Sequence, residues 1–171
     1  MALTCHVLIG WERPEFSKVN MNISKLNINI GGRPSEGFSS NASVQALEAR
    51  LGSKLPAAYL QFIRSANGGH PEAGSFFLEA SWDASISVDW FYSLGHGGTD
   101  SLDKALEDWS QVLGPSVLPF GRDGGGNQFY ISLVSPVGSV WYYSHEGAER
   151  IKLADSFDGF LDQLVVHPDF I

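Results

Sequence analysis

The sequence is short of cysteine, of positive charge and of long apolar runs. Cys5 is the one cysteine among 171 residues, so neither an internal disulfide nor a Cys-x-x-Cys metal or redox motif is possible. Such cysteine usage is consistent with a reducing compartment, and we expect a cytoplasmic protein. The apolar residues 7–9 follow no basic leader, and Trp11, Glu12 and Arg13 come directly after them. We therefore expect neither a signal peptide nor a membrane-spanning segment.

Positive charge is the scarcer sign. The chain has 11 Lys and Arg against 19 Asp and Glu, which gives a formal net charge of −8 at pH 7. Nucleic acid repels such a chain, so we expect no direct DNA or RNA binding, whereas a basic protein is attracted to it. What the chain does have is apolar and aromatic content, 43% and 12% of its residues. This composition is typical of a folded globule and, at this length, of a single domain.

Hydrophobic periodicity predicts a domain of the α+β class. Ser43 is the expected N-cap of a first helix that stops at Gly52, and Thr99 or Asp100 is the expected cap of a third. The expected helices cover residues 43–51, 56–66, 99–113 and 154–165. Alternating, strand-like segments occupy residues 75–80, 86–94, 116–121, 127–134, 138–145 and 150–154. Because short turns join most of these strands, we expect a mostly antiparallel sheet of about five or six strands, flanked by helices and followed by a C-terminal helix.

Residues 1–42 are expected to form an N-terminal extension that is partly loop, and residues 43–171 the domain itself. The alternation of apolar residues from Leu26 to Ile30 predicts an edge strand within this extension. Met1 and Met21 are both possible starts of the chain.

Three consecutive glycines, at positions 124–126, invite comparison with a phosphate-binding loop. A P-loop continues with Lys and then Ser or Thr, and it opens a helix whose amides bind phosphate. Here Asn127 follows, the next residues alternate as in a strand, and Asp123 would repel a phosphate. We interpret the glycines as a tight turn between two strands, which uses glycine's access to positive φ.

No catalytic or metal-binding constellation stands out in the sequence. No recognised metal spacing connects the five histidines, which are His6, His70, His96, His145 and His167. The Gly-x-Ser-x-Gly motif of α/β-hydrolases does not occur, and the carboxylate pairs suit helix starts and solvated helix faces. By residue chemistry we expect no catalytic residue, no metal and no cofactor.

Four segments occur in an informative order. They are LEARLGSKLPAAYLQFIRSANGG at residues 47–69, LPFGRDGGGNQFYISL at 118–133, GSVWYYSHE at 138–146 and LADSFDGFLDQL at 153–164. In this order they resemble the SUKH superfamily, which includes a fungal regulator of cell-wall synthesis and bacterial immunity proteins of polymorphic toxin systems. The resemblance implies a structural motif made of Leu55, Pro56, Asn67, Gly68, Gly69, Gly124, Gly125, Gly126, Phe157 and Phe160.

The same resemblance implies a single α+β domain without enzyme activity. For bacterial members it implies binding and neutralising a cognate protein toxin, often a nuclease or a nucleic-acid deaminase. An acidic inhibitor suits such a partner, because toxins that act on nucleic acid carry basic sites and electrostatic steering speeds their capture. We expect the protein to be a monomer.

Tight binding also needs buried aromatic anchors, because steering alone does not supply affinity. The candidate partner-binding residues combine aromatic and acidic side chains: Trp82, Asp83, Asp89, Trp90, Tyr92, Asp123, Trp141, Tyr143 and Glu146. Their alternative role is structural, as core rings and solvating charges. Two other functions stay open: a regulatory or scaffold interaction domain, and a small-ligand-binding domain or enzyme that uses the Gly121–Gln128 loop with Arg122.

Overall fold

The computed structural model describes residues 21–38, 40–78 and 84–170, so the predicted partner-binding residues Trp82 and Asp83 lie outside the described residues. The helices are α1 Asn41–Leu51, α2 Ala57–Ser65, α3 Leu102–Leu113 and α4 Phe157–Gln163, with short 3-10 turns η1 Ile23–Leu26 and η3 Pro168–Phe170. The strands are β1 Ile28–Ile30, β2 Arg33–Pro34, β3 His70–Pro71, β4 Ser75–Phe77, β5 Ser85–Ser87, β6 Trp90–Phe91, β7 Val117–Arg122, β8 Gln128–Ser132, β9 Val140–Ser144 and β10 Glu149–Ala154.

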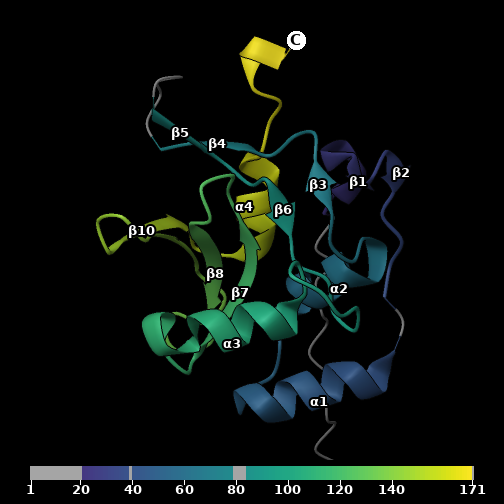
Figure 1. Ribbon diagram of the computed structural model, residues 1–171, viewed down its shortest axis with the longest axis vertical. Coiled ribbons are helices and arrows are strands. Elements are labelled where there is room, and N and C mark those ends of the chain that lie inside the picture. Colours follow the sequence, from purple (N-terminus) through teal and green to yellow (C-terminus); the bar gives the residue numbers. More distant parts are fainter. Residues whose placement is uncertain (1–20, 39, 79–83, 171) are drawn as a thin grey trace, which may run out of the picture.

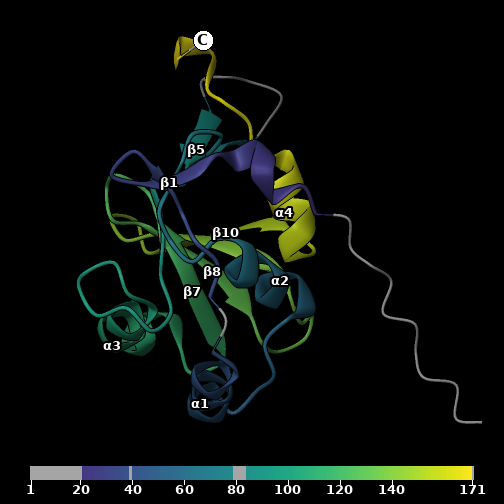
Figure 2. The same ribbon diagram turned by 90° about the vertical axis from the view of Figure 1, so that its right-hand side faces the viewer.

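An antiparallel sheet in the order β10-β9-β8-β7-β6 forms the centre of the fold. Helix α3 crosses one face of this sheet, and α2 and α4 cover the other face (Figures 1 and 2). The predicted α+β class, with its antiparallel sheet and C-terminal helix, is confirmed. Within the part of the chain that the structure describes, no helix combines the length and the apolar character needed to cross a membrane.

Cross-strand register gives the sheet two different faces, because side chains alternate along each strand. One row crosses the five strands on the side of α2 and α4, through Phe91, Gly121, Phe129, Tyr142 and Ile151. The neighbouring row crosses them on the side of α3, through Trp90, Arg122, Gln128, Tyr143 and Arg150. The first row is apolar and belongs to the main core, whereas the second carries the polar and half-exposed side chains.

Aromatic rings fill the space between the sheet and helices α2 and α4. The ring centroid of Phe157 on α4 lies 5.0 Å from that of Phe120 and 5.4 Å from that of Phe62, both edge-on. Phe160, one helical turn later, packs against Phe120 at 5.6 Å. All four rings are at most 1% exposed, and burial of each contributes about 2 kcal/mol to stability. Phe157 and Phe160 therefore fix α4 to the core.

Serine side chains cap the first and third helices, at positions other than those predicted. The Oγ atoms of Ser40 and Ser101 accept backbone N–H groups three residues later, at 3.3 and 3.2 Å. The predicted caps, Ser43 for the first helix and Thr99 or Asp100 for the third, were wrong. Several residues with the same capping chemistry precede each helix, so composition alone does not select among them.

The loop that joins α1 to α2 begins at Gly52 and ends at Pro56. Gly52 closes α1 in the left-handed conformation, with φ 64°. Pro56 directly precedes the first residue of α2, and Leu55 beside it is 5% exposed. Helix α2 ends through Ala66, which is extended. Positive φ angles follow two and three residues later, at Gly68 and Gly69.

Part of the predicted N-terminal extension is built into the same core. Strand β1 lies between β2 and β3, so it is a middle strand and not the edge strand that was predicted. Reciprocal backbone hydrogen bonds between Gly69 and Phe91, at 3.0 and 2.9 Å, join this small sheet to the β6 edge of the large one. Met21, Leu26 and Ile28 are all less than a tenth exposed. Residues 21–34 thus pack as one unit with the domain.

The hydroxyl of Tyr59 on α2 is buried without a hydrogen-bond partner among the described residues. Its side chain is 1% exposed and packs edge-on against Phe157. A buried polar group without a partner costs roughly 1–3 kcal/mol, so Tyr59→Phe is expected to raise the free energy of unfolding by about 1 kcal/mol in urea denaturation.

The matched control is Tyr92→Phe. The Tyr92 hydroxyl donates to Gln128 Oε1 at 2.8 Å, and both side chains are buried. Removing it leaves the Gln128 acceptor unbonded, so stability is expected to fall by about 1 kcal/mol. A Tyr59→Phe variant that loses stability to the same degree would contradict the assignment.

Candidate protein-binding surface

The glycine triplet forms the connection between the paired strands β7 and β8. The carboxylate of Asp123 closes this loop, because its Oδ1 accepts the backbone N–H groups of Gly125 and Asn127, both at 2.9 Å. Gly126 has φ +87°, which glycine adopts without strain. The amides that a phosphate would need are bonded to the protein's own carboxylate. The geometry therefore favours the turn interpretation over phosphate binding.

The second oxygen of Asp123 is also engaged within the protein. Its Oδ2 accepts the Tyr142 hydroxyl at 2.7 Å and the Asn127 side-chain amide at 2.8 Å. Burial and the adjacent Asp123 carboxylate raise the pKa of the Tyr142 hydroxyl. In the described structure, Asp123 acts as a loop-forming residue.

Buried tyrosines make stability fall at alkaline pH. Burial raises the pKa of Tyr92 from the ordinary 10.0 to about 12, and it also raises the pKa values of Tyr59 and Tyr142. The folded protein keeps these protons where the unfolded chain releases them, so the stabilisation is complete below about pH 10 and is lost as pH rises through about 12. For Tyr92 alone the loss amounts to about 2 kcal/mol. The loss is measured as the difference between the free energies of unfolding at about pH 9 and about pH 11.5. This difference is expected to be smaller in Tyr92→Phe. An unchanged drop in that variant would refute the contribution of Tyr92.

Arg122 joins two carboxylates at the β6 end of the sheet. Its Nη1 donates to Asp89 Oδ2 at 2.8 Å, and its Nε and Nη2 donate to Asp100 Oδ1 at 3.2 and 3.0 Å. The Nδ1 atom of His70 lies 3.6 Å from Asp89 Oδ1. The guanidinium is therefore bound by the protein's own acids, and its Nη1 also donates to the backbone oxygen of Asp123 at 3.4 Å. Two negative charges share one positive charge here.

A groove of about 340 Å³ opens beside this ion-pair cluster. Its walls come from β1, the 67–69 segment, β6 and the loop that leads into α3. We call it the Trp90 groove; its lining includes Ile30, Gly68, Trp90, His96, Gly97 and Asp100. Ile30 is 47% exposed, and the Trp90 ring is half-buried. The groove thus presents an apolar wall, an aromatic ring and a carboxylate to solvent.

Asn67 holds one side of the Trp90 groove in place. Its Oδ1 accepts the backbone N–H of Leu94 and its Nδ2 donates to the Leu94 carbonyl, both at 2.8 Å, while Nδ2 also lies 3.2 Å from His96 Nδ1. Asn67 is 3% exposed. One buried amide therefore fixes the loop that carries His96, which explains why an asparagine suits this position of the predicted structural motif.

A second surface lies across the sheet, at the other end of α3. Val134 and Trp141 line a hollow of about 350 Å³ there, and Val112, Val134 and Val137 are 42%, 54% and 61% exposed. We call these four residues the Trp141 surface. Nearby, Arg150 donates to the last carbonyls of α3, which stabilises the helix end.

The structure separates the predicted partner-binding residues instead of gathering them. Trp90 and Trp141 lie on the same face of the sheet but three strands apart, about 14 Å at normal strand spacing. Tyr92 and Tyr143 are 4% and 8% exposed, so they are core residues and contribute no exposed surface. Glu146 is exposed in the turn between β9 and β10. A binding role for the exposed residues stays a prediction.

Ile30 and Asp100 line the Trp90 groove, and sequence reasoning predicted neither of them as a binding residue. Ile30 belongs to the predicted strand of the extension, and nothing local indicated that this strand would face Trp90. Asp100 was predicted only as a helix cap, because an aspartate directly before an apolar helical repeat is most often the N-cap of that helix. The helix is capped by Ser101, which leaves the Asp100 side chain to pair with Arg122.

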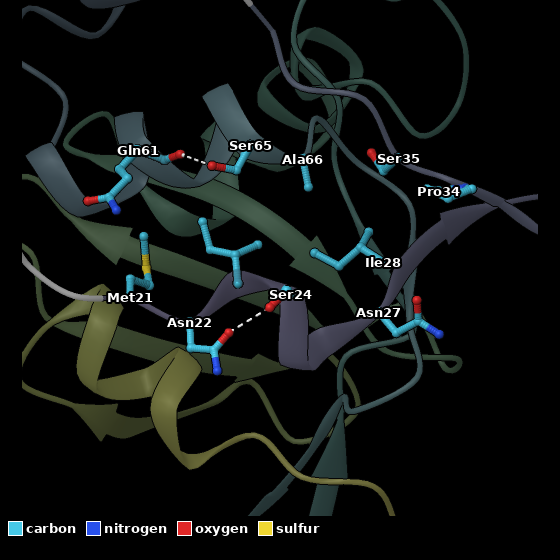
Figure 3. A pocket seen from close by; sticks show the side chains of 11 residues that line it. Met21, Asn22, Ser24, Asn27, Ile28, Pro34, Ser35, Gln61, Ser65 and Ala66 are labelled. Atoms are coloured by element: carbon cyan, nitrogen blue, oxygen red, sulfur yellow. Dashed lines mark hydrogen bonds between the residues drawn. The ribbon is translucent and has the colours of Figure 1, made fainter.

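Another hollow, with a volume of about 470 Å³, lies elsewhere, between η1 and α2 (Figure 3). Asn22 and Ser24 reach it from η1, and Gln61 and Ser65 from α2, as the labelled side chains show. None of the residues that line it is acidic, basic or a histidine. The described residues also contain no group of three His, Cys, Asp or Glu side chains that could hold a metal ion.

Comparison with known proteins identifies the scaffold. The model of the SMI1 / KNR4 family (SUKH-1) matches residues 39–163, from just before α1 to the end of α4. The chain is also 24% identical over 173 residues to the SPbeta prophage-derived uncharacterized protein YokK of Bacillus subtilis (strain 168), a comparison that covers 90% of this chain and 88% of the relative. The matched segment contains three of the four sequence segments that suggested the superfamily and all but the last residue of the fourth, and the predicted resemblance is confirmed. The chain therefore belongs to the SMI1 / KNR4 family (SUKH-1).

Proposed function

We propose that the protein is an immunity-type protein, which binds a cognate protein toxin and neutralises it by covering its surface, without catalysis and without a cofactor. The observation that carries the proposal is membership of a family that includes immunity proteins, over residues 39–163. Neutralisation by occlusion requires a stable folded surface, and it requires no chemistry from the inhibitor.

The charge of the chain supports a basic partner, such as a protein that acts on nucleic acid. A net charge of −8 attracts a cationic surface over several ångströms and disfavours nucleic acid itself. Electrostatic steering of this kind raises association rates to about 10⁸–10⁹ M⁻¹s⁻¹ at low salt. Fast capture suits a protein whose partner damages the cell for as long as it is free.

Helix α3 connects the two candidate surfaces. Asp100, in the Trp90 groove, precedes its first turn, and Val112 of the Trp141 surface lies in its last turn. The exposed side between them carries Asp103, Glu107 and Asp108. Asp103 pairs with Arg50 and Asp108 with the exposed Lys104, so this side keeps one net negative charge. A helix of this length spans about 18 Å, so both surfaces fit within one protein interface of about 800 Å² per partner. A partner with a basic centre and apolar flanks would complement this face.

Co-expression with the product of the neighbouring gene tests the proposal. Cells that produce that protein alone are expected to stop growing, and cells that also produce this chain are expected to grow. The two proteins are expected to elute together from a size-exclusion column in a one-to-one complex. A toxic neighbour that is neither neutralised nor bound would contradict the proposal and favour a regulatory or scaffold role.

A further inference from the structure

We propose that the Trp90 groove binds a lysine or arginine side chain that the protein partner inserts into it. This inference rests on the proposed function and deepens it, because it names the chemistry that one part of the surface recognises. Three features of the groove support a cation: an unbalanced negative charge, a partly exposed aromatic ring and an open backbone rim.

The charge balance at the groove is negative. Asp89 and Asp100 share the single guanidinium of Arg122, which leaves one net negative charge when His70 is neutral. Both hydrogen bonds from Arg122 to Asp100 reach Oδ1. No hydrogen bond from the described residues reaches Asp100 Oδ2, and the two carboxylates are 40% and 38% exposed. A second cation would complete this ion-pair network.

The apolar wall suits the stem of a long cationic side chain. The half-buried Trp90 ring and the 47% exposed Ile30 lie in the same groove as Asp100. Lysine and arginine place their methylene groups on such apolar surfaces and keep the charged head near solvent or an acid. The face of a tryptophan ring also attracts a cation directly, with about 0.5–1 kcal/mol at an exposed site.

The rim of the groove allows a partner backbone to come close. Gly97 and Gly98 have open space where a side chain would stand. The volume of about 340 Å³ is near the lower limit for small-molecule sites. The groove is therefore suited to one or two inserted side chains of a protein.

The test uses the whole protein and two peptides, one with two adjacent arginines and one with citrulline in their place. Binding affinity is measured for every variant by isothermal titration calorimetry, at low and at physiological salt, and the indole N–H signal of Trp90 in NMR spectra locates the site in the wild-type chain. The arginine peptide is expected to bind and to shift this signal, and the citrulline peptide is expected to bind at least about five-fold more weakly, since it lacks the charge.

Three variants separate the groove from the general charge of the protein. Asp100→Asn and Trp90→Leu are expected to weaken binding of the arginine peptide by about five-fold each. Asp155→Asn is the charge-matched control, because Asp155 is exposed and pairs with Lys152 on the β10 side of the sheet. It is expected to change the affinity less than about two-fold. Thermal melting checks that each variant is folded. If Asp100→Asn does not fold, the affinity of Trp90→Leu decides the test.

Three outcomes would overturn the inference: no shift of the Trp90 signal, equal binding of the citrulline peptide, or equal weakening by Asp155→Asn. The same variants are then compared in the co-expression experiment. If the wild-type chain gives no protection, the proposed function fails whatever the peptides show. If it protects and the two groove variants bind the toxin as tightly as wild type, the groove inference alone fails.

Discussion

Replacing Asn67 with alanine is expected to lower the free energy of unfolding by about 3 kcal/mol. The side-chain amide is the hydrogen-bond partner of both the N–H and the carbonyl of Leu94, a residue only 4% exposed. Alanine leaves both backbone groups buried and unbonded, and each such group costs roughly 1–3 kcal/mol. Urea denaturation followed by tryptophan fluorescence measures the change.

Asn22→Ala is the matched control for this substitution. Asn22 is exposed, and its side chain accepts only the hydroxyl of Ser24, so its removal is expected to change stability by less than about 0.5 kcal/mol. If Asn67→Ala were as mild as the control, the amide would not be what holds the loop at residues 94–100. The prediction also concerns function, because that loop is a wall of the Trp90 groove.

Gly69→Ala is expected to destabilise the protein by about 3 kcal/mol or more, since it combines backbone strain with a steric clash. Gly69 has φ +120°, and a Cβ atom there would stand 2.7 Å from the backbone oxygen of Asn29 in β1. Neither group moves without breaking the contact between β1 and β3 or the bridge from Gly69 to Phe91. The loss is expected in urea denaturation, together with faster hydrogen exchange in β1.

Gly97→Ala provides the comparison at a glycine of the same groove. Position 97 has open space where a Cβ atom would stand, and its φ is not positive. Alanine is therefore tolerated there, and it reduces the conformational entropy of the unfolded chain. The free energy of unfolding is expected to change by no more than about 1 kcal/mol. Equal destabilisation by the two substitutions would show that the close approach of β1 is not the cause.

The fold was largely predictable because local signals and tertiary packing agree. The aromatic residues of the fourth predicted helix, among them Phe157, do face the core, and the alternating segments from residue 116 onward pair with their neighbours in the chain. The predicted strand at residues 86–94 is divided between β5 and β6, which belong to two different sheets. The helix caps at Ser40 and Ser101 were missed, because neighbouring residues offer the same side-chain chemistry. The position of β1 in the middle of its sheet depends on pairing with β3, about forty residues later in the chain, and no local pattern encodes that partner.

The candidate surface was less predictable, because burial depends on what covers each face of the sheet. Alternation along a strand would divide the aromatic trios at residues 90–92 and 141–143 between core and surface. Helix α3 covers one face and helices α2 and α4 the other, so Tyr92, Tyr142 and Tyr143 are all buried. Trp90 remains half-exposed because it stands at the β6 edge, beyond the centre of the sheet. Exposure was therefore decided by position across the sheet.

The position of β1 has a consequence for how relatives of this protein diverge. The family match begins at residue 39, yet Ile30, upstream of that segment, forms one wall of the Trp90 groove. Within β1, Ile28 is 7% exposed and belongs to the core, whereas Ile30 is 47% exposed and lines the recess. A substitution at position 30 therefore changes the shape of the recess without removing a core side chain, so relatives can differ at this position and keep the same scaffold.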